Sequence, residues 1–126
     1  MPGPRGGRGG FGGIGWWLSA YSLLLIAEKP RHGYEIASEL RNLGFPILGV
    51  GQMGAVYRTL TSLEASGFII SEWDTTSSPP RKVYKITRIG REYLEEMKME
   101  ILSLKKMIDK FVEKFERIES NGDYPV

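Results

Sequence analysis

The stretch "FIISEWDTTSSPPRKVYKIT", residues 68–87, marks the point where the sequence pattern of this chain changes. Its two ends, Phe68–Trp73 and Lys82–Thr87, are rich in aromatic and β-branched residues, which is typical of strands. The polar segment between them contains two adjacent prolines and predicts a loop. We therefore predict a β-hairpin with a long loop, in which alternate residues of the second strand face the core and the solvent.

Three helices are predicted before this hairpin. The first is the apolar run Trp16–Glu28, and the second, Gly33–Leu43, has apolar residues at helical spacing. Between them, "KPRHG" at residues 29–33 predicts a turn because proline and glycine interrupt regular structure. The third helix, Gly54–Ser66, is predicted to end at Gly67. Its predicted buried stripe is Val56, Leu60 and Leu63.

A final helix is predicted to begin near Arg88, with Thr87 as its N-cap. Its apolar residues recur at alternating intervals of three and four, which is the a/d pattern of a coiled coil. Such a stripe is too long for the preceding unit to cover and would leave a large exposed apolar patch. We therefore predict that it packs against a second copy or against the first helix of a partner subunit; the alternative is folding back on its own domain. The seam residues are Leu94, Met97, Ile101, Leu104, Ile108, Phe111, Phe115 and Ile118.

Composition excludes several classes of protein. The 126 residues, 41% hydrophobic and 25% charged, are typical of one soluble domain with an appendage. The absence of cysteine excludes disulfides and cysteine-ligated metals. The single histidine, His32, has no nucleophile or carboxylate cluster near it in sequence, so we expect a structural role, no metal, no cofactor and no enzymatic activity. The apolar run that ends at Glu28 is too short for a membrane span, and we expect a cytoplasmic protein.

The chain is predicted to have four parts. Residues 1–14 hold seven of the sixteen glycines and form a predicted disordered Gly/Arg-rich tail. Residues 15–89 form the domain of three helices and a hairpin, residues 90–120 the dimerisation helix and residues 121–126 a flexible C-terminus. The net charge is +2, with the basic excess in the front part of the chain, which weakly favours a polyanionic partner.

Three helices followed by a hairpin is the order of a winged helix-turn-helix, whose third helix enters the major groove of DNA. The predicted fold class is therefore mainly α with a small β-hairpin, extended by a long C-terminal dimerisation helix. On the third helix the outward face is small and polar with one arginine, and glycines at its predicted start would offer free amides to a phosphate. The predicted DNA-binding residues are Tyr34, Gly54, Ala55, Tyr57, Arg58, Thr61, Ser62, Arg81, Lys82 and Lys85.

Three segments carry a resemblance to a known family. "LLLIAEKPRHGYEIASEL", "GAVYRTLTSLEASGFI" and "RKVYKITRIGREYL" resemble the signature segments of PadR-family transcriptional regulators, in the family's order. The resemblance implies a winged-helix dimer that binds operator DNA, usually as a repressor, and often releases it on binding a small molecule. The single long final helix is similar to that of the family's shorter subgroup. Ala55 and Arg58 stand where the family usually has serine and proline, so the operator sequence cannot be carried over.

Two further readings remain open at this stage. Aromatic residues and methionines near the seam could line a pocket for a small aromatic effector, although such residues more often form core. The candidate pocket residues are Trp16, Trp17, Met97, Met107 and Phe111. The alternative to a DNA-binding regulator is a winged-helix module that binds a protein partner through the third helix or the seam.

Overall fold

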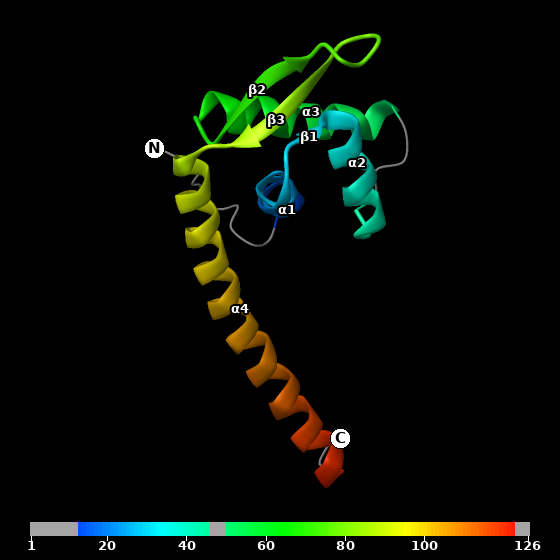
Figure 1. The fold of residues 1–126 in the computed structure, drawn as a ribbon. Helices are drawn as coiled ribbons and strands as arrows, with labels where there is room; N and C mark the ends of the chain where they lie inside the picture. The colour runs from blue at the N-terminus through cyan, green and yellow to red at the C-terminus, as the bar shows by residue number, and fades with distance from the viewer. Residues whose placement is uncertain (1–12, 46–49, 123–126) are drawn as a thin grey trace. The chain divides into compact units, whose positions relative to one another are not determined.

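A computed structural model describes residues 13–45 and 50–122. Most of the predicted N-terminal tail, and the last four residues of the predicted flexible C-terminus, lie outside this range. The fold is the predicted one, mainly α-helical with a small sheet and a long C-terminal helix (Figure 1). Its elements are α1 (Ile14–Glu28), β1 (Arg31–His32), α2 (Gly33–Asn42), α3 (Val50–Ala65), β2 (Ile69–Asp74), β3 (Arg81–Ile86) and α4 (Arg88–Asn121).

The sheet has three antiparallel strands in the order β1-β3-β2, so the predicted hairpin is confirmed and a third strand joins it. The predicted turn at residues 29–33 was wrong in part, because Arg31 and His32 form β1 and pair with Tyr84 and Val83 of β3. The Arg31 side chain also donates a 2.8 Å hydrogen bond from Nε to the Leu25 carbonyl. These bonds fix the chain between α1 and α2 as a strand.

The core lies where α1 contacts α2, α3 and β3. The predicted inward stripe of α3 is confirmed, since Val56 and Leu60 are fully buried and Leu63 nearly so. Apolar side chains from every helix of this unit and from both long strands complete the core, among them Leu18, Leu23, Leu25, Ile26, Ile36, Leu40, Ile69 and Tyr84.

Helix α3 ends where the sequence predicted but begins earlier. Gly67 has a φ of +81°, its amide donates to the Glu64 carbonyl, and the Phe68 amide donates to the Leu63 carbonyl. This pair of bonds is a Schellman C-cap, which requires a residue that tolerates positive φ. The predicted start at Gly54 was wrong, because the helix already runs from Val50. A glycine inside a helix costs only about 1 kcal/mol relative to alanine, so tertiary packing can override it.

The start of α4 is held tightly against the end of α3. As predicted, Thr87 caps the helix, with its Oγ1 accepting a 3.0 Å hydrogen bond from the Gly90 amide. The same hydroxyl donates to the Gly67 carbonyl at 2.7 Å. A Cβ atom on Gly90 would lie 2.0 Å from the Phe68 carbonyl oxygen, so only glycine fits there. The Phe68 ring stacks on Tyr93 with 4.3 Å between centroids.

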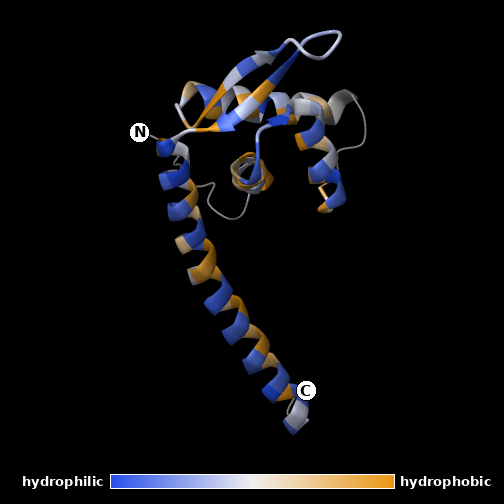
Figure 2. Cartoon of the chain, in the orientation of Figure 1, coloured by the Kyte–Doolittle hydropathy of each residue, from blue (hydrophilic) through white to orange (hydrophobic). Residues whose placement is uncertain are grey.

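The chain divides into two compact units, Met1–Leu94 and Glu95–Val126. The second unit is the greater part of α4, and Figure 2 shows hydrophobic residues recurring along one side of it. Met97 is only 2% exposed, whereas the later seam residues Ile108, Phe111, Phe115 and Ile118 are all exposed. Among the described residues, no helix combines the length and the apolar character that crossing a membrane requires.

Candidate nucleic-acid interface

The outward face of α3 is the first part of the candidate site. Tyr57, Arg58, Thr61 and Ser62 are exposed, and Ala55 is half-buried. Thr59 turns its hydroxyl back to the Ala55 carbonyl at 2.9 Å and so takes no part in this face. The predicted division of α3 into a buried apolar face and a small polar face is therefore confirmed.

Gly54 lies on this face, but not in the predicted role. Because α3 begins at Val50, the Gly54 amide is not among the unpaired amides of the first turn, so the free amide that was predicted at Gly54 is not found there. A Cβ atom on Gly54 would instead lie 3.1 Å from Nη1 of Arg58. Because Gly54 has no side chain, the Arg58 guanidinium can lie close to the α3 backbone at this position. Within the described residues, no carboxylate pairs with Arg58.

Tyr57 packs against the start of α2. A Cβ atom on Gly33 would lie 2.7 Å from Cε1 of the Tyr57 ring, so the absence of a side chain at Gly33 permits this approach. The Tyr57 side chain is nevertheless 44% exposed, and Tyr34, one residue beyond Gly33, is 64% exposed. On β3, burial raises the pKa of the Tyr84 phenol, and the nearby Glu64 and Tyr57 raise it further. Tyr57 on α3 and Tyr34 at the start of α2 are therefore both accessible from solvent.

His32 connects α2 to the hairpin. It is the N-cap of α2 in a capping box, and its own amide donates a 2.8 Å hydrogen bond to Oε1 of Glu35. Its ring lies between two carboxylates, with Nδ1 3.0 Å from Glu35 Oε1 and Nε2 3.2 Å from Asp74 Oδ2. The hydrogen bond from the His32 backbone lowers the pKa of Glu35. The structure thus gives His32 contacts that organise the fold, and the sequence did not reveal Asp74 as its partner.

Asp74 also organises the hairpin loop. Its Oδ1 accepts hydrogen bonds from the Thr76 amide, at 3.0 Å, and from the Thr76 hydroxyl. The Ser77 hydroxyl donates to Oδ2 at 3.3 Å. These bonds, above all those from Thr76, lower the pKa of Asp74 to about 2. The carboxylate is therefore charged at neutral pH and holds the first turn of the loop.

The three predicted basic residues of the hairpin lie on two faces of β3. Lys85 Nζ lies 2.9 Å from Glu72 Oε1 on the neighbouring strand, so its charge is already paired. Lys82, on the opposite face of β3, lies over the Trp73 ring with Nζ 5.9 Å from the centroid. Arg81 is exposed beside the loop. The available positive charge is therefore at Arg81 and Lys82, near the tip of the hairpin.

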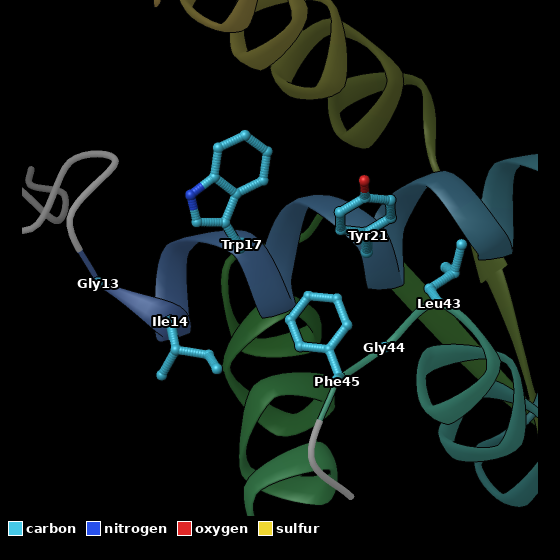
Figure 3. A pocket seen from close by; sticks show the side chains of 7 residues that line it. All are labelled: Gly13, Ile14, Trp17, Tyr21, Leu43, Gly44 and Phe45. Carbon is cyan, nitrogen blue, oxygen red and sulfur yellow. The ribbon is translucent and has the colours of Figure 1, made fainter.

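A pocket of about 510 Å³ lies beside α1 (Figure 3). Of the predicted pocket residues, Trp17 lines it, and Trp16 packs edge-on against Trp17 with 4.9 Å between centroids. Met97, Met107 and Phe111 belong to the second unit, Glu95–Val126. Tyr21 and Phe45, which sequence reasoning missed, meet edge-on at 5.4 Å. The lining residues are Gly13, Ile14, Trp17, Tyr21, Leu43, Gly44 and Phe45.

No group of three or more histidine, cysteine, aspartate or glutamate side chains suited to hold a metal ion occurs in the described parts of the chain. The candidate site offers hydroxyl groups, aromatic rings and the cations at Arg58, Arg81 and Lys82. Such groups suit non-covalent recognition of phosphates and base edges.

Comparison with known proteins agrees with this geometry. The crystal structure of TM0937, a conserved protein of unknown function described as a potential transcriptional factor, is 47% identical with a TM-score of 0.75, covering 94% of this chain and 99% of that chain. A PadR family transcription regulator from hypervirulent Clostridium difficile R20291 is 28% identical with a TM-score of 0.66, covering 76% and 98%. Transcriptional regulator Rv3488 of Mycobacterium tuberculosis is 34% identical over 70 residues, which are 56% of this chain and 62% of that protein.

The family comparison covers the same elements. Residues 23–96, from within α1 to the first turns of α4, match the model of the Transcriptional regulator PadR-like family. The match spans more than half of the chain and includes the whole of α2, α3 and the sheet. The chain therefore belongs to the PadR-like family of transcriptional regulators.

Proposed function

We propose that this regulator is a cytoplasmic homodimer that binds operator DNA sequence-specifically and represses transcription, with release by a small aromatic effector. One observation carries the DNA-binding part of the proposal. On the exposed face of α3, Arg58 has no carboxylate partner among the described residues and lies among small polar residues. Its guanidinium lies beside Gly54, where the absence of a side chain leaves space for it.

The small side chains Ala55, Thr61 and Ser62 would let the α3 backbone approach the major groove closely. Arg58 could then bind a guanine edge with two hydrogen bonds, which is the commonest specific contact between protein and DNA. The exposed Tyr34 and Tyr57 would contact phosphates beside the groove through their hydroxyls. Contacts to phosphates position the protein, whereas contacts to base edges select the sequence.

The hairpin serves as the wing, and its cations would bind the DNA backbone. Lys82 and Arg81 have no carboxylate partner among the described residues, whereas Lys85 is paired with Glu72. Each phosphate that a cation neutralises releases counterions and makes binding weaker as salt rises. We therefore expect Lys82 to contribute more to the salt dependence than Lys85.

Three matched alanine variants test this assignment. Operator duplexes would first be selected from a random pool, and binding would then be measured by fluorescence anisotropy at several salt concentrations. Arg58→Ala is expected to cost about 1–3 kcal/mol on the selected sequence only, and Lys82→Ala to lower the salt slope by about one on every duplex. Lys85→Ala is the control and should leave the slope nearly unchanged. Equal losses for Arg58→Ala on selected and random duplexes would show that α3 reads no bases.

The dimer is proposed to form along the seam of α4. Its residues from Ile108 to Ile118 are exposed in the single chain, and the exposed Met107 and Val112 widen the stripe. The proposed occupant is a second copy, because the unbroken 3-4 spacing is that of a helix packing on a similar helix. It would also place two α3 helices on one duplex.

Replacement of Ile108 by glutamate tests the seam. Because the Ile108 side chain is 52% exposed in the single chain, Ile108→Glu should leave each chain folded but yield monomers in light scattering. The control is Met99→Glu, since Met99 is also exposed but lies on the opposite side of the helix from the seam. Dimers that survive Ile108→Glu, or monomers from both variants, would contradict the seam.

The effector is proposed to bind in the pocket beside α1. The pocket beside α1 has the size of a small-molecule site and is lined by the rings of Trp17, Tyr21 and Phe45. Planar aromatic compounds are the class of ligand that such rings bind by stacking. We expect a compound of this class to quench Trp17 fluorescence and to lower DNA affinity, and Trp17→Phe to remove the quenching. If no compound in a panel of planar aromatic compounds changes the Trp17 fluorescence or the DNA affinity, the proposed effector is refuted and the proposed DNA binding is not.

The alternative is a protein-interaction module of the same fold. The exposed apolar seam is the observation that favours it, because such a stripe could bind another protein. The random-pool selection distinguishes the two functions. Enrichment of a sequence with salt-sensitive affinity supports the DNA-binding regulator, and a pool that yields no duplex binder at low salt supports the module.

A further inference from the structure

The wing carries an exposed tryptophan that the helices of the domain do not cover. Trp73 lies in β2 one residue before its end, is 64% exposed, and pairs across the strands with Lys82. Tryptophan is usually buried for most of its surface, so an indole as exposed as this calls for a partner. The hairpin loop next to it projects away from the helices (Figure 1).

The register of the sheet gives the face on which Trp73 lies. Residues two apart in a strand share a face, so Ile69, Ser71 and Trp73 lie together. Ile69 is buried, and the Ser71 hydroxyl donates a 2.7 Å hydrogen bond to Glu64 of α3. Trp73 therefore continues, toward the loop, the face of the wing that is turned to α3. Ile70 lies on the other face and is 47% exposed.

The cation over the Trp73 ring favours a polyanion over an apolar protein surface as the partner. The ammonium of Lys82 lies over the indole, 5.9 Å from its centroid. Arg81, which precedes Lys82 in β3, is exposed, but it lies on the other face and pairs across the strands with Asp74, so Lys82 is the cation on the face of Trp73. A flat apolar ring beside a cation matches the repeat of a DNA strand, in which the carbon face of each deoxyribose adjoins a phosphate.

We propose that Trp73 and Lys82 together form a contact with the DNA backbone, in which the indole packs on a deoxyribose and the Lys82 ammonium binds the adjacent phosphate. This inference rests on the proposed DNA-binding function and assigns to it a residue that the sequence pattern had placed only in a strand. The contact reads no base. It anchors the wing so that α3 keeps one register in the groove.

Substitutions of Trp73 and Lys82 should change the salt dependence of DNA affinity in different ways. Trp73→Ala removes apolar contact but no charge, so affinity should fall about fivefold on every duplex with the salt slope unchanged. Lys82→Ala removes a charge, so the slope itself should fall by about one. Trp73→Phe keeps a flat ring and should recover most of the affinity lost in Trp73→Ala.

The test uses the full chain, the selected duplex and an unrelated duplex of equal length. Ile70→Ala is the matched control, because it removes an exposed apolar side chain from the same strand but from the opposite face. Loss of affinity on both duplexes for Trp73→Ala, with Ile70→Ala within twofold of the wild type, supports the contact. Wild-type affinity for Trp73→Ala, or a loss confined to the selected duplex, overturns it while the proposed function stands. A wild-type protein that binds no duplex overturns the proposed function and this contact with it.

A spectroscopic measurement keeps the inference testable if an alanine variant folds poorly. In the double variant Trp16→Phe, Trp17→Phe, Trp73 is the remaining tryptophan of the three in the chain. Its emission should be quenched and shifted to shorter wavelength when duplex is added, because packing on the sugar removes water from the indole. Unchanged emission at saturating duplex, with binding shown by anisotropy, would overturn the contact.

Discussion

Replacement of Gly90 by alanine tests the close approach of α4 to the backbone of Phe68. Gly90 lies in the first turn of α4, where an added Cβ would meet the Phe68 carbonyl oxygen at 2.0 Å and Cγ1 of Ile86 at 2.9 Å. A carbon atom and a carbonyl oxygen in ordinary contact lie more than 3 Å apart. The start of α4 would have to move away from Phe68 by more than 1 Å, because the obstructing oxygen belongs to the backbone and cannot rotate away as a side chain could.

The cost can be worked from the bonds at this junction. The Phe68 carbonyl accepts hydrogen bonds from the Thr87 amide and from the Thr87 hydroxyl, both at 3.1 Å. Overpacking costs about 1–3 kcal/mol, and a hydrogen bond lost at a buried carbonyl costs about 1–3 kcal/mol more. Alanine returns up to about 1 kcal/mol through its higher helix propensity. We expect a net loss of about 3 kcal/mol in the free energy of unfolding.

Thermal and denaturant unfolding, compared at one protein concentration, measure this loss. For a domain of this size about 3 kcal/mol lowers Tm by about 10 °C or more. Gly15→Ala is the matched control, because Gly15 also lies in the first turn of a helix and nothing lies within 4 Å of its added Cβ. If Gly90→Ala unfolds within about 0.5 kcal/mol of Gly15→Ala, the close approach of α4 to Phe68 is not a constraint on the fold.

Three other substitutions separate structural from functional roles. Gly54→Ala should raise the free energy of unfolding by up to about 1 kcal/mol, because alanine favours helix. It should weaken operator binding, because the new methyl group displaces the Arg58 guanidinium. Wild-type affinity for the operator in fluorescence anisotropy would show that the space at Gly54 is unimportant. Thr76→Val should raise the pKa of Asp74, now about 2, toward its usual value, which carboxylate NMR titration would detect. Because the folded pKa lies below the unfolded one, the stabilisation from Asp74 is present above about pH 4 and is lost as the pH falls toward 2, and in this variant it should be lost nearer pH 4. His32→Ala should lower the free energy of unfolding, measured by thermal unfolding, by about 1 kcal/mol because the cap of α2 is lost. His32→Asn should recover much of this loss, because asparagine is also a good N-cap. No recovery would assign the loss to the contact between His32 and Asp74 of the hairpin.

Local patterns predicted the helices, the hairpin and the division of α3 into faces. Val56, Leu60 and Leu63 recur at helical spacing, and this period alone defines which side is buried. Gly67 predicted the end of α3 because its positive φ is a local requirement of the cap. Features of this kind depend on residues a few positions apart, which a sequence displays directly.

Features that depend on distant partners could not be predicted. The two residues of β1 form a strand only because β3 lies beside them, and their own sequence predicts a turn. The pairing of Lys85 with Glu72 depends on the register of the hairpin. Gly54 predicted a helix start because glycine disfavours helices, yet it lies inside α3, which begins at Val50. Tertiary contacts outweigh local preference at each of these positions.

The separation of the two faces of α3 has a consequence for how such regulators diversify. Thr61 and Ser62 are exposed, whereas Val56, Leu60 and Leu63 of the same helix are buried in the core. Substitutions at these positions should therefore leave the core intact, so that under the proposed function the DNA sequence that is bound could change while the fold is kept.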